Sequence, residues 1–437
     1  MTTASGVPDT SGIGNTVAER CDLGDRPTKA QTVAQVLGFD GQHVRNVLAD
    51  GRGQILFAVA LGWCLSIGVR LAYPVLLPYL QSGLGLDLTT AGFLLTVLWL
   101  AYALGQLPGG ILSDRLGEGN VLVLSTAISA VMLGVVAVAG SAPWVFFATA
   151  CFGFGTALYG VARFTILSAV FPNNDGTAIG ITMAAGEVGN AVLPLVAGGI
   201  AATLAWQYGF GLAVPVFALV AVLLWFVVPA RTSSATSAVD SLSLEAARYV
   251  VAELRRPAII VVTVIQILTY CIWQGFTGLY PTYLIEMKGF SEAMATGLFS
   301  AFFALGIVVQ PLTGRLYDSF GIRRSLPVVL SVITVSLVAL PFLEGFWPVV
   351  VGTIFLSSIL GYGTITLPYM TAAFPADMKG TGLGLLRTFY MTIGAASPAL
   401  FGILADNGYF DEGYIVLAGF AVVAIALIPL LPNEASG

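Results

Sequence analysis

The chain has 437 residues, of which 57% are hydrophobic and only 9% are charged. Since average soluble domains carry roughly 25% charged residues, this composition excludes an ordinary water-soluble protein. Apolar runs of about 20 residues, the length that crosses a bilayer as a helix, recur along nearly the whole chain. The sequence therefore predicts an all-α membrane protein that crosses the bilayer many times.

The residue inventory also leaves little room for enzyme chemistry. The four cysteines are far apart, the only histidine is His43, and neither a G-x-S-x-G nor a G-x-x-x-x-G-K-[ST] pattern occurs. Those two patterns mark hydrolases and P-loop ATPases, and clustered cysteines or histidines mark metal sites. We therefore expect no enzyme activity, no cofactor and no metal site.

The apolar runs, counted in chain order, give twelve spans in two sets of six. The first six are expected at about 54–80, 90–113, 120–140, 143–171, 177–203 and 208–230. The second six are expected at about 257–286, 292–314, 325–343, 346–373, 381–405 and 412–432. The prediction is two pseudo-symmetric six-helix bundles, a 6+6 arrangement, at 53–230 and 257–433.

Two hydrophilic segments lie outside these bundles. Residues 1–52 are predicted to be an N-terminal tail, with a short amphipathic helix around 33–48. Residues 231–256 are predicted to link the bundles. Their apolar positions Leu244, Ala247, Val251 and Leu254 share one helical face, which is typical of a helix lying at a membrane surface.

The loop charges predict the orientation. If the tail is cytoplasmic, fourteen of the 18 Lys and Arg residues lie in cytoplasmic segments and one, Lys288, lies in an outer loop. The positive-inside rule then places both termini in the cytoplasm of a cell with this protein in its plasma membrane. Only three of the basic residues are lysines, which indicates either a halophilic prokaryote or a GC-rich genome.

A short polar segment between spans 2 and 3 occurs again between spans 8 and 9. Gly110, Asp114 and Gly117 match Gly314, Asp318 and Gly321 at an offset of 204 residues. Internal duplication of six-helix halves is a recurrent plan of transporters, whose substrate site lies between the halves near mid-membrane.

The segment Gly110-x-x-x-Asp114-Arg115-x-Gly117 resembles the signature loop of the major facilitator superfamily, and the repeat and the 6+6 layout fit that family. Glu118 and Gly119 stand where the family usually has a second basic pair. The resemblance implies a monomeric transporter that works by alternating access. It also implies that Asp114 and Arg115 hold the halves together on the cytoplasmic side, with Asp114 facing the start of span 11. A tight turn capped by Asp114 explains the glycines equally well.

Four ionisable residues lie deep inside the predicted spans, namely Arg70, Arg163, Glu187 and Arg387. Because a charge at mid-bilayer costs about 2.5–3.5 kcal/mol on insertion scales, we expect these residues to face the protein interior. Arg163 and Glu187 have comparable depths in neighbouring spans, so an ion pair is one hypothesis. Glu187 is also the one candidate for proton coupling.

Arg70 and Arg387 would then have no acidic partner. The planar guanidinium suits carboxylate or phosphate groups, so the pair predicts an anionic substrate. The resemblance points the same way, since Ser66–Arg70 is similar to the first span of the organic-anion and organic-phosphate branches of the superfamily. Arginines that merely snorkel or bond to backbone carbonyls are the alternative. Further candidates for the substrate site are Tyr159, and Gln266, Tyr270, Trp273 and Gln274, which share one face of span 7.

These observations predict a secondary active transporter for a small organic anion, coupled to a proton or to a counter-anion. Two alternatives stay open: efflux of neutral or cationic compounds, and a non-transporting sensor that signals through residues 1–50. The lipid bilayer and a small solute are the expected partners, and nucleic acid is not.

Overall fold

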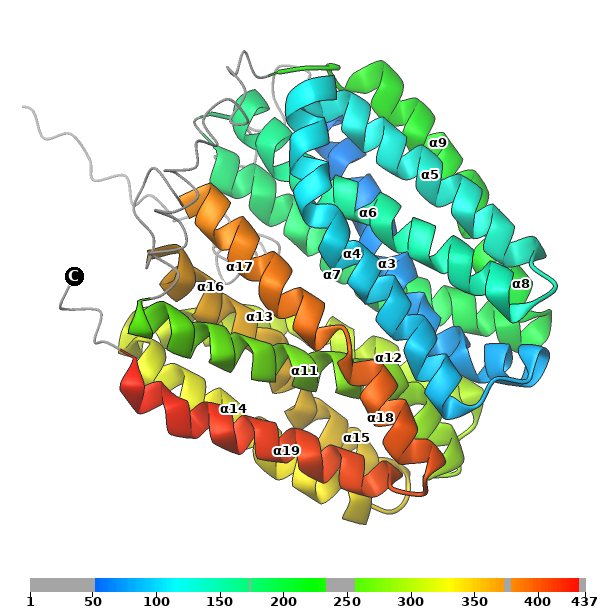
Figure 1. The fold of residues 1–437 in the computed structure, drawn as a ribbon, viewed down its shortest axis with the longest axis vertical. Helices are drawn as coiled ribbons and strands as arrows, with labels where there is room; N and C mark the ends of the chain where they lie inside the picture. The colour runs from blue at the N-terminus through cyan, green and yellow to red at the C-terminus, as the bar shows by residue number, and fades with distance from the viewer. Residues whose placement is uncertain (1–51, 173, 233–255, 373–378, 432–437) are drawn as a thin grey trace, which may run out of the picture.

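A computed structural model describes residues 52–172, 174–232, 256–372 and 379–431. Within these residues, twelve helical segments are long and apolar enough to cross a membrane. They form two bundles of six spans each, which lie side by side in Figure 1. The predicted fold class is confirmed. The predicted amphipathic segments at 33–48 and 231–256 lie wholly or almost wholly outside the described residues.

The first bundle is built from long helices. They are α3 (Gly53–Leu84), α4 (Leu88–Leu116), α5 (Glu118–Val138), α6 (Ala142–Val170), α7 (Asp175–Thr203) and the pair α8 (Trp206–Gly211) and α9 (Ala213–Val227), which together make the sixth span. The helices are apolar on nearly all sides, because each faces either lipid or its neighbours. Long side chains on the outer surface, such as Trp225 and Phe226, are exposed, as lipid contact requires.

The second bundle repeats this order with interrupted helices. It comprises α11 (Pro257–Glu286), α12 (Glu292–Ala304) with α13 (Gly306–Phe320), α14 (Ile322–Ala339), α15 (Phe346–Leu356) with α16 (Tyr362–Ala372), α17 (Lys379–Gly394) with α18 (Ser397–Asp406), and α19 (Phe410–Leu427). Spans 8, 10 and 11 are therefore broken within the membrane. Broken helices are tolerated there because the surrounding helices satisfy the freed backbone groups. At the third break, the Ser397 hydroxyl donates to the Cys271 carbonyl (2.8 Å).

The two bundles pack tightly at the end of the molecule where α18 meets the start of α4, which we call the Asp406 end. A Cβ on Gly92 would lie 2.3 Å from the Pro398 carbonyl oxygen, and one on Gly402 would lie 2.4 Å from that of Leu88. Small residues let the helix backbones approach this closely. The Asp406 carboxylate also accepts hydrogen bonds from the backbone N–H groups of Leu88 (3.0 Å) and Thr89 (2.7 Å).

At the opposite end of the molecule, where α4 is followed by α5 at Gly117, the two bundles contact each other less closely. We call it the Gly117 end. Among the described residues, the halves of spans 8 and 11 nearer the Asp406 end, α12 and α18, contact the first bundle more extensively than the halves nearer the Gly117 end, α13 and α17. The structure thus shows the bundles joined at the Asp406 end and loosely apposed at the Gly117 end.

Candidate functional site

Arg70 lies at the centre of the candidate site, on the inner face of α3. Its side chain is 1% exposed, and its Nε donates to the Ser66 carbonyl one turn earlier (3.0 Å). Its Nη1 and Nη2 atoms have no hydrogen-bond partner in the described part of the chain. A buried charged group normally has its hydrogen bonds satisfied. Arg70 therefore presents unused, positively charged donors.

Aromatic rings surround this guanidinium. Its Cζ atom lies 3.8 Å from the ring centre of Tyr102, 5.3 Å from that of Trp99 and 5.6 Å from that of Trp63. Cation–π contact of this kind stabilises a desolvated arginine by about 2 kcal/mol. The rings help to hold the charge in place.

Arg163 comes from α6 and lies against the same aromatic group. Its Nη1 donates to the Gly160 carbonyl (2.7 Å), and its Cζ lies 3.3 Å from the ring centre of Trp63. The hypothetical ion pair with Glu187 is not formed in this structure. Part of Arg163 is instead satisfied by backbone, as the alternative interpretation predicts, while its Nε has no hydrogen-bond partner among the described residues.

Arg387 approaches from the second bundle, on α17. It interacts with Tyr390 on the same helix. All three arginines act electrostatically on Tyr102, and Arg70 and Arg387 act on Arg163. The structure therefore brings together Arg70 of α3 and Arg163 of α6, both in the first bundle, and Arg387 of α17 in the second bundle.

The face of α11 that the sequence predicted also reaches this region. The rings of Tyr270 and Trp273 stack with centroids 5.9 Å apart, and Gln274 Nε2 donates to the Tyr270 hydroxyl (3.0 Å). The Oε1 atoms of the buried Gln274 and Gln266 have no hydrogen-bond partner in the described residues. This face thus offers unused acceptors as well as ring surface.

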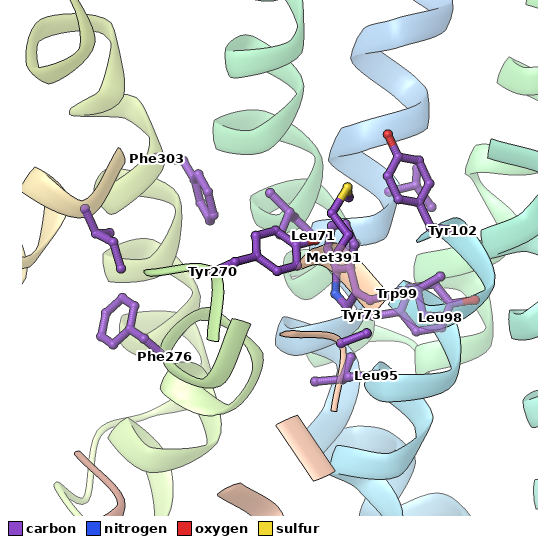
Figure 2. Close-up of a cluster of buried hydrophobic side chains, with 14 of the residues drawn as sticks. Leu71, Tyr73, Leu95, Leu98, Trp99, Tyr102, Tyr270, Phe276, Phe303 and Met391 are labelled. Carbon is purple, nitrogen blue, oxygen red and sulfur yellow. The ribbon is translucent and has the colours of Figure 1, made fainter. Parts of the chain in front are cut away.

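A ring contact across the bundles joins the two walls. Trp273 of α11 and Trp99 of α4 meet edge to face, with centroids 5.5 Å apart. Figure 2 shows Tyr270 on one side, Trp99 and Tyr102 on the other, and Met391 of α17 between them. The candidate site therefore lies between the bundles, near the middle of the spans.

Tyr159 is not brought into this site in the same way. Its side chain is fully buried, and its hydroxyl donates to the Val59 carbonyl of α3 (2.8 Å). The Gly62 position leaves room for that hydroxyl, because a Cβ there would lie 2.2 Å from it. The structure favours a packing role for Tyr159, between α6 and α3.

Glu187 of α7 contacts the other bundle. Its carboxylate accepts from Gln310 Nε2 of α13 (3.0 Å) and from Asn190 Nδ2 of its own helix (3.2 Å). The site of contact is the start of α13, just after the break in span 8. Glu187 is thus a membrane-embedded carboxylate that links the bundles through amide groups.

Several site residues could not be recognised from the sequence pattern that identified the others. Trp63, Trp99, Tyr102 and Tyr390 carry no charge and lie in apolar runs, where aromatic residues usually indicate packing. One signal was available, since Trp63 and Arg70 are seven residues apart and share a face of α3. Gln310 and Asn190 were detectable only as polar residues within the spans.

The duplicated loop at the Gly117 end has a clear structural role within each bundle. Gly117 and Gly321 have positive φ angles of 91° and 69°, which explains why glycine occupies both positions. Gly119 is needed as well, because a Cβ there would lie 2.1 Å from the Pro229 carbonyl oxygen. The loop is therefore packed against the end of the sixth span.

Arg231 stabilises the contact between this loop and the end of the sixth span. Its Nη2 donates to the carbonyls of Asp114 and Arg115 (both 2.7 Å), which are at the end of α4, and the Glu118 carboxylate accepts from the Thr232 N–H (3.1 Å). Arg323 similarly donates to the Pro429 carbonyl in the second bundle. In the described residues the Asp114 side chain makes no hydrogen bond to the second bundle. Its latching role at the start of span 11 stays a prediction.

Two bundles of six membrane spans, with buried polar groups from both between them, define a polytopic membrane protein built on a transporter plan. A sequence model of the Major Facilitator Superfamily matches residues 58–396. The chain belongs to this superfamily. It is therefore a transporter of the membrane and not an enzyme.

Curated relatives and a solved structure agree with this assignment. The chain is 23% identical to the hexuronate transporter of Bacillus subtilis over 378 residues, which cover 81% of this chain and 88% of that one. It is 26% identical to the glycerol-3-phosphate transporter of Bacillus subtilis over 423 residues, covering 87% and 92%. A bacterial homologue of the human lysosomal transporter Spinster, inward-facing and unoccupied, superposes with a TM-score of 0.73 at 18% identity, covering 88% and 97%. This last likeness concerns the fold alone.

Proposed function

We propose that this protein is a secondary active transporter that moves a small organic anion across the cytoplasmic membrane by alternating access. The observation that carries the proposal is Arg70, a buried guanidinium between the bundles with two unpartnered nitrogen atoms. Arg163 of α6 and Arg387 of α17 add further positive charge. The names of two relatives support the same class, since hexuronate and glycerol-3-phosphate are both organic anions.

The physical basis is the balance of charge and hydrogen bonds. Hydrogen bonds to charged groups contribute about 1.5–3 kcal/mol each, and a guanidinium can bind a carboxylate or phosphate through two of them. An anion at Arg70 would satisfy donors that have no hydrogen-bond partner in the described structure. A neutral solute could accept these hydrogen bonds but would leave the buried charge uncompensated, and a cationic solute would add to it, so this geometry disfavours efflux of such compounds.

The state of the bundles suggests how the site is reached. The Asp406 end is joined by Asp406, Gly92 and Gly402, whereas the Gly117 end is loosely apposed. With the termini cytoplasmic, as the loop charges predict, the conformation is closed to the outside. Rocking of the bundles about the central site would break the Asp406 contacts and bring the Gly117 end together, where Asp114 and Arg115 would act.

Glu187 supplies two alternatives for coupling. A proton that binds its carboxylate would remove the charge that strengthens the hydrogen bond accepted from Gln310 and so weaken the link between the bundles, which would couple transport to protons. If Glu187 stays ionised throughout, exchange of one anion for another fits better. Both alternatives are compatible with a monomer.

The test is uptake of labelled hexuronate, glycerol 3-phosphate and benzoate into proteoliposomes by the purified full-length protein. We expect Arg70→Gln and Arg387→Gln to reduce uptake of any transported anion at least ten-fold. Arg324→Gln serves as the matched control, because Arg324 is exposed at the Gly117 end. Unchanged uptake in both site variants would refute the anion-site proposal. Export of only neutral or cationic compounds would establish the efflux alternative.

A further inference from the structure

The surface beside the three arginines consists mainly of aromatic rings. Trp99 is the pivotal residue, because its ring lies 5.3 Å from the Arg70 guanidinium and 5.5 Å from the ring of Trp273. Trp273 in turn stacks on Tyr270, whose ring meets Tyr390 of α17 at 5.5 Å. A continuous row of rings therefore runs from the anion-binding donors of the first bundle to α17 of the second.

This row places ring surface where the body of a bound anion would lie. A carboxylate on the free nitrogens of Arg70 has its carbon skeleton within reach of the Trp99–Trp273 contact. The two rings there meet edge to face, an arrangement that a flat unsaturated group can replace by contacting both rings. Such a body would touch α4 and α11 together, so that it bridges the bundles as the ring contact does now.

The polar groups near the rings argue against a polyhydroxylated body. Gln274 is fully buried, and one N–H of its amide donates to the Tyr270 hydroxyl. Its Oε1 has no hydrogen-bond partner among the described residues, and the Oε1 of Gln266, which also has none, lies about two turns earlier in α11. A sugar acid has a hydroxyl on nearly every carbon, and hydroxyls that face rings lose their bonds to water without replacement.

We infer that the anion carried by this protein is a flat, unsaturated carboxylate, such as an aromatic acid, with its carboxylate on Arg70 and its body between Trp99 and Trp273. A single hydroxyl on that body would donate to Gln274. This inference rests on the proposed function, because it names the class of anion for the same site. It separates this chain from a transporter of sugar acids.

The experiment compares three monocarboxylates in proteoliposomes that contain the full-length protein: benzoate, cyclohexanecarboxylate and glucuronate. Cyclohexanecarboxylate has the charge and nearly the size of benzoate but lacks a flat ring. The three unlabelled acids compete with the uptake of labelled benzoate. We expect benzoate to compete at least ten-fold better than cyclohexanecarboxylate, and glucuronate to compete more weakly than either.

Variants then assign the preference to the rings. Trp273→Leu should reduce the ratio of benzoate to cyclohexanecarboxylate affinity about ten-fold, and Trp273→Phe should restore most of it. Trp225→Leu is the matched control, because Trp225 is 64% exposed on the lipid-facing surface of α9, and it should leave the ratio unchanged.

The outcomes distinguish this inference from the proposed function. Equal or better competition by glucuronate, or a wild-type ratio near one, overturns the flat-carboxylate inference while organic-anion transport stands. A preference for benzoate that survives in Trp273→Leu also overturns it. If none of the anions in either experiment is transported or competes, the proposed function fails with it.

Discussion

Asp406 offers a direct test of how the bundles are held together. Its carboxylate, at the end of α18, accepts from the first two N–H groups of α4, at 3.0 Å from Leu88 and 2.7 Å from Thr89. These groups have no partner within their own helix, and the positive end of the helix dipole favours a negative charge there. Asp406→Asn keeps the size of the side chain but removes the charge and one of the two acceptors.

The expected magnitude follows from these two contacts. Hydrogen bonds to charged groups contribute about 1.5–3 kcal/mol when buried. Asp406 is exposed, and solvent reduces the contribution of exposed charges. We therefore expect Asp406→Asn to weaken the closed Asp406 end by about 1–2 kcal/mol, which is a factor of roughly 5–30 in the ratio of closed to open molecules. Asp406→Ala should shift this ratio further.

The measurement is the distance distribution between spin labels on either side of this end. Ser82→Cys and Asn407→Cys, introduced in a cysteine-free background, provide labelling sites that are exposed and lie in different bundles. We expect a dominant short distance in the parent protein and a population of longer distances that grows in Asp406→Asn.

Asp87 provides the matched control for this experiment. It caps the same helix from within the first bundle, accepting from the Thr90 N–H (2.7 Å). Hydrogen bonds from the Thr90 hydroxyl and from this N–H hold the pKa of its carboxyl below the ordinary value. Asp87→Asn removes a charge at the start of α4 without removing a contact between the bundles. Identical distance distributions in Asp406→Asn and the parent protein would refute the reasoning, as would an equal shift in Asp87→Asn.

Three other predictions concern separate parts of the molecule. Glu187→Gln should reduce proton-driven accumulation of substrate at least ten-fold while anion exchange continues, and accumulation at the wild-type level would rule out proton coupling through Glu187. Gly119→Ala should lower the free energy of unfolding by about 1–3 kcal/mol, because its Cβ would lie 2.1 Å from the Pro229 carbonyl oxygen. Gly297→Ala is the control, because the space around Gly297 is open. Equal melting temperatures for the two variants would contradict the close-packing argument. Arg231→Gln should speed hydrogen exchange at the end of α4, where it now binds two carbonyls, and unchanged exchange there would show that these bonds do not hold the helix end.

The spans were predictable because they depend mainly on composition. A run of apolar residues that is long enough crosses the membrane wherever it occurs, and each predicted span coincides with a helical segment of the structure. The convergence of Arg70, Arg163 and Arg387 was also predictable. A charge in such a span is costly unless it faces the protein interior.

The contacts between distant residues could not be predicted in this way. Glu187 was expected beside Arg163, but depth along a helix leaves the direction of a side chain open, and the carboxylate lies beside Gln310 and Asn190 instead. The breaks near residues 305 and 395 have no strong signal in an otherwise apolar run. Gly119 appeared as a departure from the family pattern, whereas the structure shows that the sixth span requires a glycine there.

The unpartnered nitrogens of Arg70 have a consequence for the transport cycle. In the proposed cycle the Gly117 end also closes, and the Arg70 charge, which is 1% exposed here, then loses its remaining access to water without an anion, at a cost of up to several kcal/mol for an uncompensated buried ion. A bound carboxylate removes most of that cost. The loaded carrier should therefore reorient faster than the empty one, so that substrate on the far side of the membrane accelerates uptake. Counterflow measurements would detect this trans-stimulation.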